Sequence, residues 1–511
     1  MMDWILQIAP AWAEAHAPAL LILLPMLAGP LSAFLPGGGR LAWLLTVVVT
    51  TLCTLLSIIL LAQVQSVEGG AIISYAMGGW APPHGIEFRI DALNVLVLLL
   101  VSSIALLTSI FSWPTIKAEI ADGKRAMFFG AFQVCFMGLL GVAATGDAFN
   151  LFVFLELSSI ATYVLVALGS GRDRRALPAA INYLLMGTIG ASFYVVGVGF
   201  LYAATGTLNM ADLAVQLQDV GGNRAVQVGF AFILVGLGLK AAMFPLHQWL
   251  PNAYAYSPSF VTAFLAATAT KVAIYAMVRF LFSVFSLDFA FEGMSLAFIL
   301  APMGIAAMLA CSFQAIFQAD IRRTLAYSSV AQVGYMLLGI SLGTAAGVSA
   351  GMFHLVNHAL MKGALFMAVG GVVLTYQGTR IHDFAGLGRS APWTMTAFAI
   401  AGLSLIGVPL TAGFQSKFAL VSALLESGWW WAALIVVFSS VLAVVYMGRI
   451  LEAVFFRAPN NPHKEHKEAP LLILVPLWIL AIANIWVGVS GGFVYGLADD
   501  AASALFIGGA S

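Results

Sequence analysis

Ionisable side chains inside apolar stretches are the part of this sequence that could do chemistry. Glu156 interrupts the run LFVFLELSSIATY (151–163), and it is the one acidic residue outside the expected loops and helix ends. Four lysines also lie well inside apolar runs, namely Lys240, Lys271, Lys362 and Lys417. Each charge at the middle of a bilayer costs roughly 2.5–3.5 kcal/mol. Five together cost on the order of 15 kcal/mol, so a function is needed to explain them.

One glutamate cannot neutralise four lysines. A buried lysine without an acidic partner can release its proton, because desolvation disfavours the ammonium form. A nearby acid favours that form again, so Glu156 and Lys240 would load and unload a proton if their helices touch. The pattern therefore indicates proton transfer. The structural alternatives are a buried ion pair and snorkelling, and snorkelling fits Arg279, which lies near a helix end.

Two histidines share a spacing of four with one of these lysines. His354, His358 and Lys362 lie in FHLVNHALMKGALF, and this spacing places all three on one helix face. Histidine titrates near neutral pH, which favours a proton relay. A metal site on the histidine pair is an alternative, but no third ligand accompanies it. The remaining alternative is a pair of packing histidines.

The composition excludes a soluble protein. Hydrophobic residues make up 61% of the 511 residues and charged residues only 9%, whereas soluble domains carry roughly 25%. Continuous apolar runs of about 20 residues predict an all-α polytopic membrane protein with about fourteen transmembrane helices. The net charge is zero, so the composition shows no excess of basic residues that would indicate nucleic-acid binding. No nucleotide-binding loop, haem motif or cysteine cluster is present, so we expect a transporter without cofactor or metal rather than an enzyme.

The basic residues predict an orientation. If the N-terminus lies outside and fourteen helices alternate, the inside loops hold fifteen of the 22 lysines and arginines. The outside loops hold only Arg89 and Arg224. Positively charged loops stay on the cytoplasmic side, so both termini are expected outside.

Two of the expected helices contain a proline. The seventh carries GLGLKAAMFPLHQWLP (236–251) with Pro245, and the twelfth carries GLSLIGVPLTAGFQSK (402–417) with Pro409. Proline breaks a helix, and such a break is tolerated at membrane depth only where it faces protein or water. Similar broken helices in two halves of opposite orientation predict inverted repeats; two unrelated kinks are the alternative. His247, beside the first break, is a secondary site candidate.

The predicted organisation has four parts. The first three helices occupy 1–126 and include an outside loop at 66–91 that is able to form a hairpin. The first five-helix repeat, helices four to eight, covers 127–284. The second, helices nine to thirteen, covers 292–455. Helix fourteen and an outside tail cover 470–511.

Several of these stretches also carry a family resemblance: FVFLELSSIATYVLV, GLKAAMFPLHQWLPNAYAYSP, TATKVAIYAMVRF, DIRRTLAYSSVAQVGYM, NHALMKGALFM and GFQSKFAL. The chain resembles the antiporter-like subunits shared by Mrp-type cation/proton antiporters, membrane-bound hydrogenases and respiratory complex I. The resemblance implies a polar axis along the membrane plane. It also implies that Glu156 is the fifth-helix glutamate and Lys240 its seventh-helix partner. Lys271 matches the eighth-helix lysine. His354, His358 and Lys362 match the eleventh-helix relay, and Lys417 matches the terminal residue of the twelfth helix.

Chain length and the lysine of GFQSKFAL favour the D-type component of Mrp antiporters within this family. The resemblance then implies the proton-translocating subunit of a multisubunit Na+/H+ antiporter in a bacterial inner membrane. The alternative is a proton-pumping membrane subunit of a complex I-like NADH:quinone oxidoreductase or a membrane-bound hydrogenase. A structural scaffold with an inert polar axis is a third class. We expect other membrane subunits, H+ and Na+ as partners, with part of the cation path in another subunit.

Overall fold

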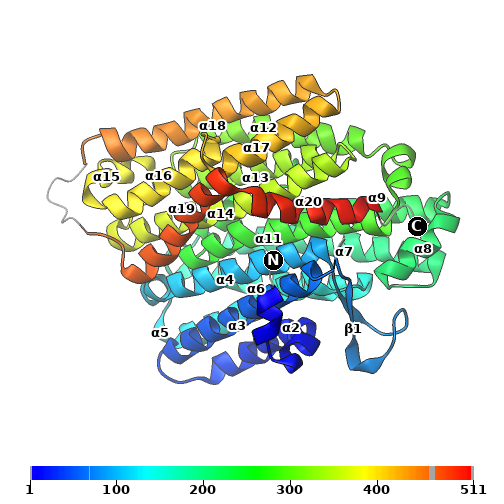
Figure 1. Ribbon diagram of the computed structural model, residues 1–511. Coiled ribbons are helices and arrows are strands. Elements are labelled where there is room, and N and C mark those ends of the chain that lie inside the picture. The colour runs from blue at the N-terminus through cyan, green and yellow to red at the C-terminus, as the bar shows by residue number, and fades with distance from the viewer. Residues whose placement is uncertain (1–2, 68–69, 460–466, 508–511) are drawn as a thin grey trace.

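The computed structural model describes residues 3–67, 70–459 and 467–507, and it confirms a polytopic α-helical membrane protein. Most helices run side by side across the molecule (Figure 1). Eleven described helices are long and apolar enough to span a bilayer. Three further expected spans are also helical: the two proline-broken ones, and α13 (Ile321–Ile340), which is more polar because it carries Arg322, Arg323 and Gln332.

The N-terminal part contains α1 (Asp3–Ile8), α2 (Ala11–Phe34), α3 (Arg40–Gln65) and α4 (Ala92–Glu119). The next part contains α5 (Asp122–Ala144), α6 (Ala148–Ala167), α7 (Ala176–Thr205), α8 (Met210–Val220), α9 (Arg224–Lys240), α10 (Trp249–Tyr256) and α11 (Ser259–Arg279). Beyond it lie α12 (Ala297–Ile316), α13, α14 (Ala345–Tyr376), α15 (Leu387–Ser390), α16 (Pro392–Ile406), α17 (Ala412–Glu426) and α18 (Trp430–Phe456). The chain closes with α19 (Leu471–Ser490) and α20 (Gly492–Ile507).

Two sets of helices share one packing order. In the first, α5 packs on α6, α6 on α7, and α7 on α9. In the second, α12 packs on α13, α13 on α14, and α14 on α16. In each set the fourth span is broken, into α9 and α10 or into α16 and α17. Because each set contains five spans, the second has the opposite orientation, which is the inverted repeat.

The loop before α4 forms a small hairpin. Strand β1 (Ile73–Ala76) pairs antiparallel with β2 (Glu87–Ile90), and buried Glu87 accepts a hydrogen bond from Asn209 at the start of α8. The hairpin and α8 lie at the same end of the bundle, at the right in Figure 1, and we call this end the hairpin face. Asp91 follows β2 directly and caps α4 with a capping box, so α4 runs from the hairpin face to the opposite end.

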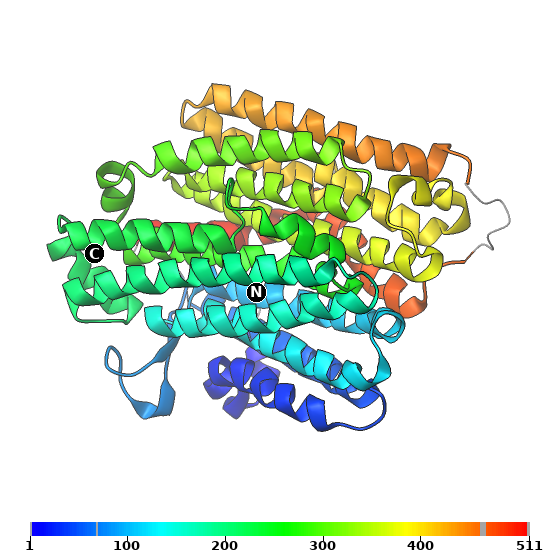
Figure 2. The same cartoon turned by 180° about the vertical axis from the view of Figure 1, so that it is seen from behind.

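Helices α11 and α14 form the centre of the molecule. They pack on each other, and nearly every residue of both is buried. Many large apolar side chains of α2, α3, α7 and α18 are instead exposed, as expected for helices that face lipid. The view from behind shows α18 along one edge and the N-terminal helices along the other (Figure 2). The C-terminal helices α19 and α20 both pack on α4 and α14, so residues 492–507 form a helix that lies against one face of the bundle (Figure 1).

Candidate functional site

Glu156 and Lys240 are brought together by α6 and α9. The Nζ atom of Lys240 lies 3.4 Å from Oε1 of Glu156 and donates to Oγ of Ser159 at 2.5 Å. The side chains of Lys240 and Glu156 are 8% and 21% exposed, respectively. Because Ser159 lies three residues after Glu156, one turn of α6 supplies both contacts. The lysine therefore has an acid and a hydroxyl within reach.

The first helix break follows Lys240 directly. Helix α9 ends at this residue, Ala242 has a φ of +56°, Pro245 lies within the irregular stretch, and α10 begins at Trp249. A lysine at the C-terminal end of a half-helix lies where the helix dipole favours a cation. His247 is buried in the same stretch, with Nε2 3.7 Å from Sγ of Cys311 on α12. His247, the secondary site candidate, thus contacts α12 of the other repeat rather than Lys240.

The second break places a lysine in a similar setting. Helix α16 ends at Ile406, and Gly407 follows in the left-handed region at φ +93°, before Pro409. Lys417 of α17 donates to the carbonyls of Leu405 and Ile406 at 3.1 and 2.9 Å. These carbonyls belong to the last turn of α16, so the ammonium again lies at the negative end of a half-helix.

Lys271 and Lys362 are both fully buried on the two central helices. Lys271 donates to the carbonyl of Ala266 at 2.5 Å, within its own helix. Lys362 donates to the carbonyl of Leu325 at 2.8 Å and to Oγ of Ser328 at 2.6 Å. Within the described residues, neither lysine contacts a carboxylate, and Lys417 does not either. The excess of lysine over acid therefore persists in the folded chain.

The two histidines lie parallel on α14. Their ring centroids are 6.2 Å apart, with an interplanar angle of 3°. His354 is held on both sides, by Ser416 at Nδ1 (2.9 Å) and by Gln332 at Nε2 (2.8 Å). His358 is fully buried, and neither ring nitrogen has a hydrogen-bond partner in the described part of the chain. Buried nitrogens of this kind are the ones that ordered water satisfies in protein interiors.

The groups of α11, α14 and α17 lie close enough for their charges to act on one another. The charge of Lys271 acts on His358 and Lys362, and the charge of Lys417 acts on His354. Tyr335 fills the last step: its ring centroid is 5.5 Å from that of His354 and 4.9 Å from Nζ of Lys417. We call the row from Lys240 to Lys417 the lysine axis. Lys240 and Lys271 share no hydrogen-bond partner among the described side chains.

Sequence reasoning missed the uncharged partners of the lysine axis, namely Ser159, Ser328, Gln332, Tyr335 and Ser416. A signal was present, because α13 reads TLAYSSVAQVGYM and is too polar for a lipid-facing helix. Its serine and glutamine lie on the turns that face α14. Among the described residues, no three metal-ligating side chains come together, so the histidine pair has no third His, Cys, Asp or Glu ligand beside it.

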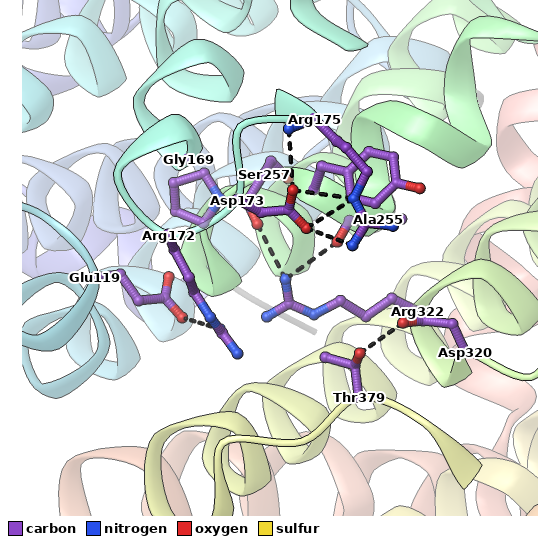
Figure 3. Close-up of a pocket in the computed structure, with 12 residues that line it drawn as sticks. Glu119, Gly169, Arg172, Asp173, Arg175, Ala255, Ser257, Asp320, Arg322 and Thr379 are labelled. Carbon is purple, nitrogen blue, oxygen red and sulfur yellow. Dashed lines mark hydrogen bonds and ion pairs between the residues drawn. The ribbon is translucent and has the colours of Figure 1, made fainter. Parts of the chain in front are cut away.

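A second polar cluster lies at the end of the bundle opposite the hairpin face. Three arginines and three acids line a cavity of about 90 Å³ there: Arg172, Arg175, Arg322, Glu119, Asp173 and Asp320 (Figure 3). We call this end the arginine face. Arg172 pairs with Glu119 at 3.2 Å, and hydrogen bonds from Arg175 hold the pKa of Asp173 below its usual range. Sequence reasoning used these arginines for orientation only.

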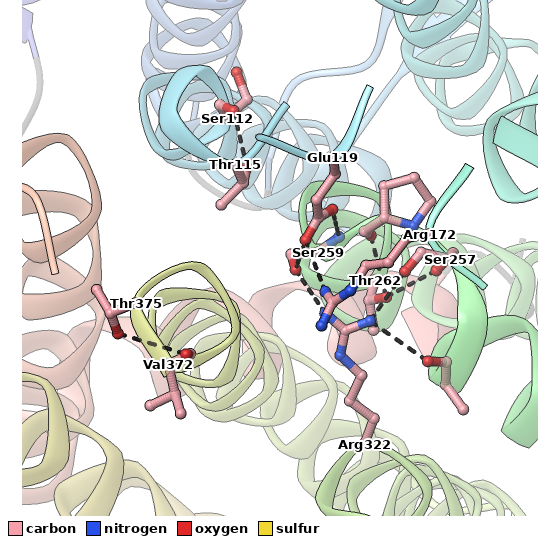
Figure 4. Close-up of polar contacts among 12 residues, drawn as sticks. Ser112, Thr115, Glu119, Arg172, Ser257, Ser259, Thr262, Arg322, Val372 and Thr375 are labelled. Carbon is pink, nitrogen blue, oxygen red and sulfur yellow. Dashed lines mark hydrogen bonds and ion pairs between the residues drawn. The ribbon is translucent and has the colours of Figure 1, made fainter. Parts of the chain in front are cut away.

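The arginine-face cluster holds the turn between α10 and α11. Buried Arg322 donates to the carbonyls of Ala255 and Ser257, at the C-terminal end of α10. Glu119 accepts from the backbone N–H of Ser259 at 2.7 Å, at the N-terminus of α11. Figure 4 shows both side chains meeting at Ser259. Pro258 cannot cap α11 with a side chain. Instead, the cation Arg322 lies at the C-terminal end of α10 and the anion Glu119 at the N-terminus of α11, and the helix dipoles favour these signs of charge at these ends.

Arg279 does not snorkel, so that expectation was wrong. Its side chain is only 12% exposed, and the guanidinium donates to Oδ1 of Asp91 at 2.7 Å. Burial raises the pKa of Asp91, but the charge and hydrogen bond of Arg279 outweigh this and hold the pKa below its usual range. The partner is Asp91, an acid in a loop that is far from Arg279 in the sequence. Periodicity alone could not reveal this contact.

The chain is similar to known membrane proteins over nearly its whole length. It is 39% identical to the N subunit of the NADH-quinone oxidoreductase of Desulforudis audaxviator (strain MP104C), over 93% of this chain and 96% of that protein. It is 30% identical to the D component of the Na(+)/H(+) antiporter of Bacillus subtilis (strain 168), over 95% of this chain and 96% of that protein.

Solved structures give the same result. One chain of the archaeal membrane-bound sulfane sulfur reductase superposes with a TM-score of 0.86 at 36% identity, covering 96% of this chain and 97% of that one. A chain of the Mrp complex from Dietzia sp. DQ12-45-1b also gives 0.86, at 26% identity and the same coverage. Residues 145–443 match the family described as NADH:quinone oxidoreductase/Mrp antiporter, TM. This match covers more than half of the chain, which therefore belongs to that family, as a membrane subunit of the proton-translocating antiporter and complex I type.

Proposed function

We propose that this chain translocates protons along the lysine axis, as one subunit of a multisubunit monovalent cation/proton antiporter. The observation that carries the proposal is the burial of Lys271, Lys362 and Lys417 without acidic partners. A permanently charged lysine in such a place costs several kcal/mol, whereas one that exchanges its proton does not remain charged. The contact between Glu156 and Lys240 supplies the acid that sets proton affinity at one end.

The axis gives the proton a series of titratable groups. A proton on Lys240 reaches Lys271, then His358 and His354 with Lys362 beside them, and finally Lys417. The histidine nitrogens take part in the relay, and ordered water at His358 bridges the gaps. The arginine face is the cytoplasmic face in this proposal, because basic loops gather there.

A redox-linked assembly is the second candidate. The 39% identity to the N subunit of an NADH-quinone oxidoreductase and the 36% identity to a chain of a sulfane sulfur reductase favour it. In that case the same lysine axis would move protons, but electron transfer in partner subunits would drive it. Other membrane subunits are partners in either assembly, and Na+ is a partner only in the first.

Replacing Lys240 with methionine or Glu156 with glutamine is expected to abolish driven proton movement while the complex still assembles. A positioned proton-transfer group contributes about a hundredfold or more to rate, so each loss should be at least of that order. The measurement is acidification of inverted membrane vesicles that contain the native complex, driven in one arm by a sodium gradient and in the other by an electron donor.

Matched controls are Lys117→Met and Glu292→Gln, which change exposed residues. Sodium-driven movement lost in the axis variants supports the antiporter. Movement that responds only to the electron donor, with Fe–S subunits co-purifying, supports the redox-linked assembly instead. Full proton movement in both axis variants would contradict both assignments and favour an inert scaffold.

A further inference from the structure

We infer that the aromatic ring of Tyr335 favours the protonated form of Lys417, in the place that a carboxylate takes beside Lys240. The ring acts through the attraction between its electron-rich face and the ammonium, so Tyr335 is a positioning residue and carries no proton itself. The inference rests on the proposed function where it concerns transport, because Lys417 is the last group of the lysine axis. It assigns a role to a side chain that the relay does not otherwise use.

The first observation is the position of the ammonium over the ring. Nζ of Lys417 on α17 lies 4.9 Å from the ring centroid of Tyr335 on α13. A cation over the face of a ring and within about 6 Å of its centroid is attracted by the negative charge of that face. Tyr335 is 1% exposed and Lys417 is 6% exposed, so little water screens this attraction. The hydroxyl of Tyr335 makes no hydrogen bond within the described residues, and the ring is the part that meets the ammonium.

The second observation is that the other partners of Lys417 are neutral. Its ammonium donates to two carbonyls at the end of α16 and to Oγ of Ser440 at 3.2 Å. Lys240, at the first helix break, instead has Oε1 of Glu156 at 3.4 Å. The two breaks therefore place a lysine in similar settings but give it different counter-groups, an acid at the first break and an aromatic face at the second.

The third observation separates Lys417 from the other lysines that lack an acid. In the described part of the chain, the cations that lie over aromatic rings are Arg175, Arg279 and Lys417. Lys271 and Lys362 therefore have no such ring among these residues. The ring favours the ammonium form at Lys417 and at neither of the other two, so it raises the proton affinity at this end of the lysine axis.

The titratable surroundings of Lys417 leave this role to the ring. The helices packed on α17 are α13, α14, α16, α18 and α19, and α16 and α19 carry no titratable side chain. From α14, His354 faces the same ring at 5.5 Å between centroids, and the charge of Lys417 acts on it. The next titratable groups along these helices and along α17 itself are Tyr327, His358, Lys362, Tyr446 and Glu426. Glu426 is the one acid in this group, and it is exposed nine residues from Lys417.

The test titrates Lys417 directly in the native complex, by solid-state ¹⁵N NMR of lysine-labelled protein. The Lys417 signal is assigned by its loss in Lys417→Arg. Tyr335→Phe keeps the aromatic face and is expected to titrate as the wild type. Tyr335→trifluorophenylalanine keeps a ring of nearly the same size, but the fluorines withdraw the negative charge from its face. Because a buried attraction of this kind corresponds to about one pH unit, Lys417 should lose its proton about one pH unit lower in the fluorinated variant than in Tyr335→Phe.

Tyr446→trifluorophenylalanine is the matched control. Tyr446 is also buried, at 1% exposure, and no cation lies over its ring among the described residues. Equal titration of Lys417 in Tyr335→Phe and in the fluorinated variant would overturn the inference, as would an equal shift in the Tyr446 control. A variant with one ring fluorine at position 335 should shift the titration less and in the same direction. This milder variant decides the matter if the complex with three fluorines does not assemble.

Driven proton movement in inverted vesicles tests the proposed function separately. The alkaline limb of its pH profile should move to lower pH in Tyr335→trifluorophenylalanine, because Lys417 then loses its proton at lower pH. A shifted Lys417 titration in a complex that moves no protons would support the role of the ring and contradict the proposed function. Normal proton movement with an unshifted titration would overturn the role of the ring alone.

Discussion

Lys271→Met is expected to abolish driven proton movement and to leave the complex at least as stable as the wild type. The lysine is fully buried, and among the described residues its ammonium donates to the Ala266 carbonyl and Oγ1 of Thr270 and to no acid. Removing it eliminates a buried group whose charged form costs roughly 2.5–3.5 kcal/mol, and no acid loses its partner. Transport should nevertheless fall about a hundredfold or more, because the relay loses a proton carrier.

The pair of measurements is vesicle acidification and the thermal unfolding midpoint of the purified complex. Lys271→Arg sharpens the test, because arginine keeps the charge and does not release its proton. We expect this variant to be as inactive as the methionine variant, and Lys117→Met to behave as wild type. Normal transport in Lys271→Arg would mean that the position needs a charge rather than an exchangeable proton, and the relay would be wrong.

Arg322→Met is expected to destabilise the subunit strongly without touching the lysine axis. The residue is 4% exposed, and its guanidinium donates to two carbonyls of the α10–α11 turn and to Oγ of Ser259. Each buried acceptor left without a donor costs about 1–3 kcal/mol, so the total loss should be about 3 kcal/mol or more. The amount of subunit in membranes and the unfolding midpoint measure it.

Arg174→Met is the matched control, because Arg174 lies in an exposed position near the same face. Arg322→Lys should give an intermediate loss, since one ammonium lacks the planar fork that reaches separate acceptors. An Arg322→Met subunit that unfolds at the wild-type temperature would show that the turn does not depend on this cap.

The sequence was sufficient for the helices and for their charged residues. Long apolar runs predict spans directly, and Pro245 and Pro409 predict both broken helices, since a membrane leaves few other ways to satisfy the backbone. The residues of the lysine axis stand out because a charge in an apolar run is costly wherever it lies. Loop 66–91 was expected to be able to form a hairpin, and the structure confirms one.

The contacts between remote segments were beyond sequence reasoning. Asp91 and Arg279 are 188 residues apart, and nothing in the local pattern of either indicates the other. The same holds for Glu119 and Ser259, which are 140 residues apart. Uncharged partners such as Gln332 were missed for another reason: the polarity of α13 indicates a buried helix, but it does not indicate which side chain each amide or hydroxyl contacts.

The three cysteines of this chain offer a built-in chemical reporter. All three thiols are buried, and that of Cys311 lies beside His247 at the first helix break, where the two repeats meet. A thiol in this position is shielded from alkylating reagents while the break stays closed. Modification of Cys311 by a membrane-permeant maleimide would therefore report any opening of the break, and Cys53 and Cys135 serve as internal references. A movement at this place would become measurable by mass spectrometry in the unaltered protein.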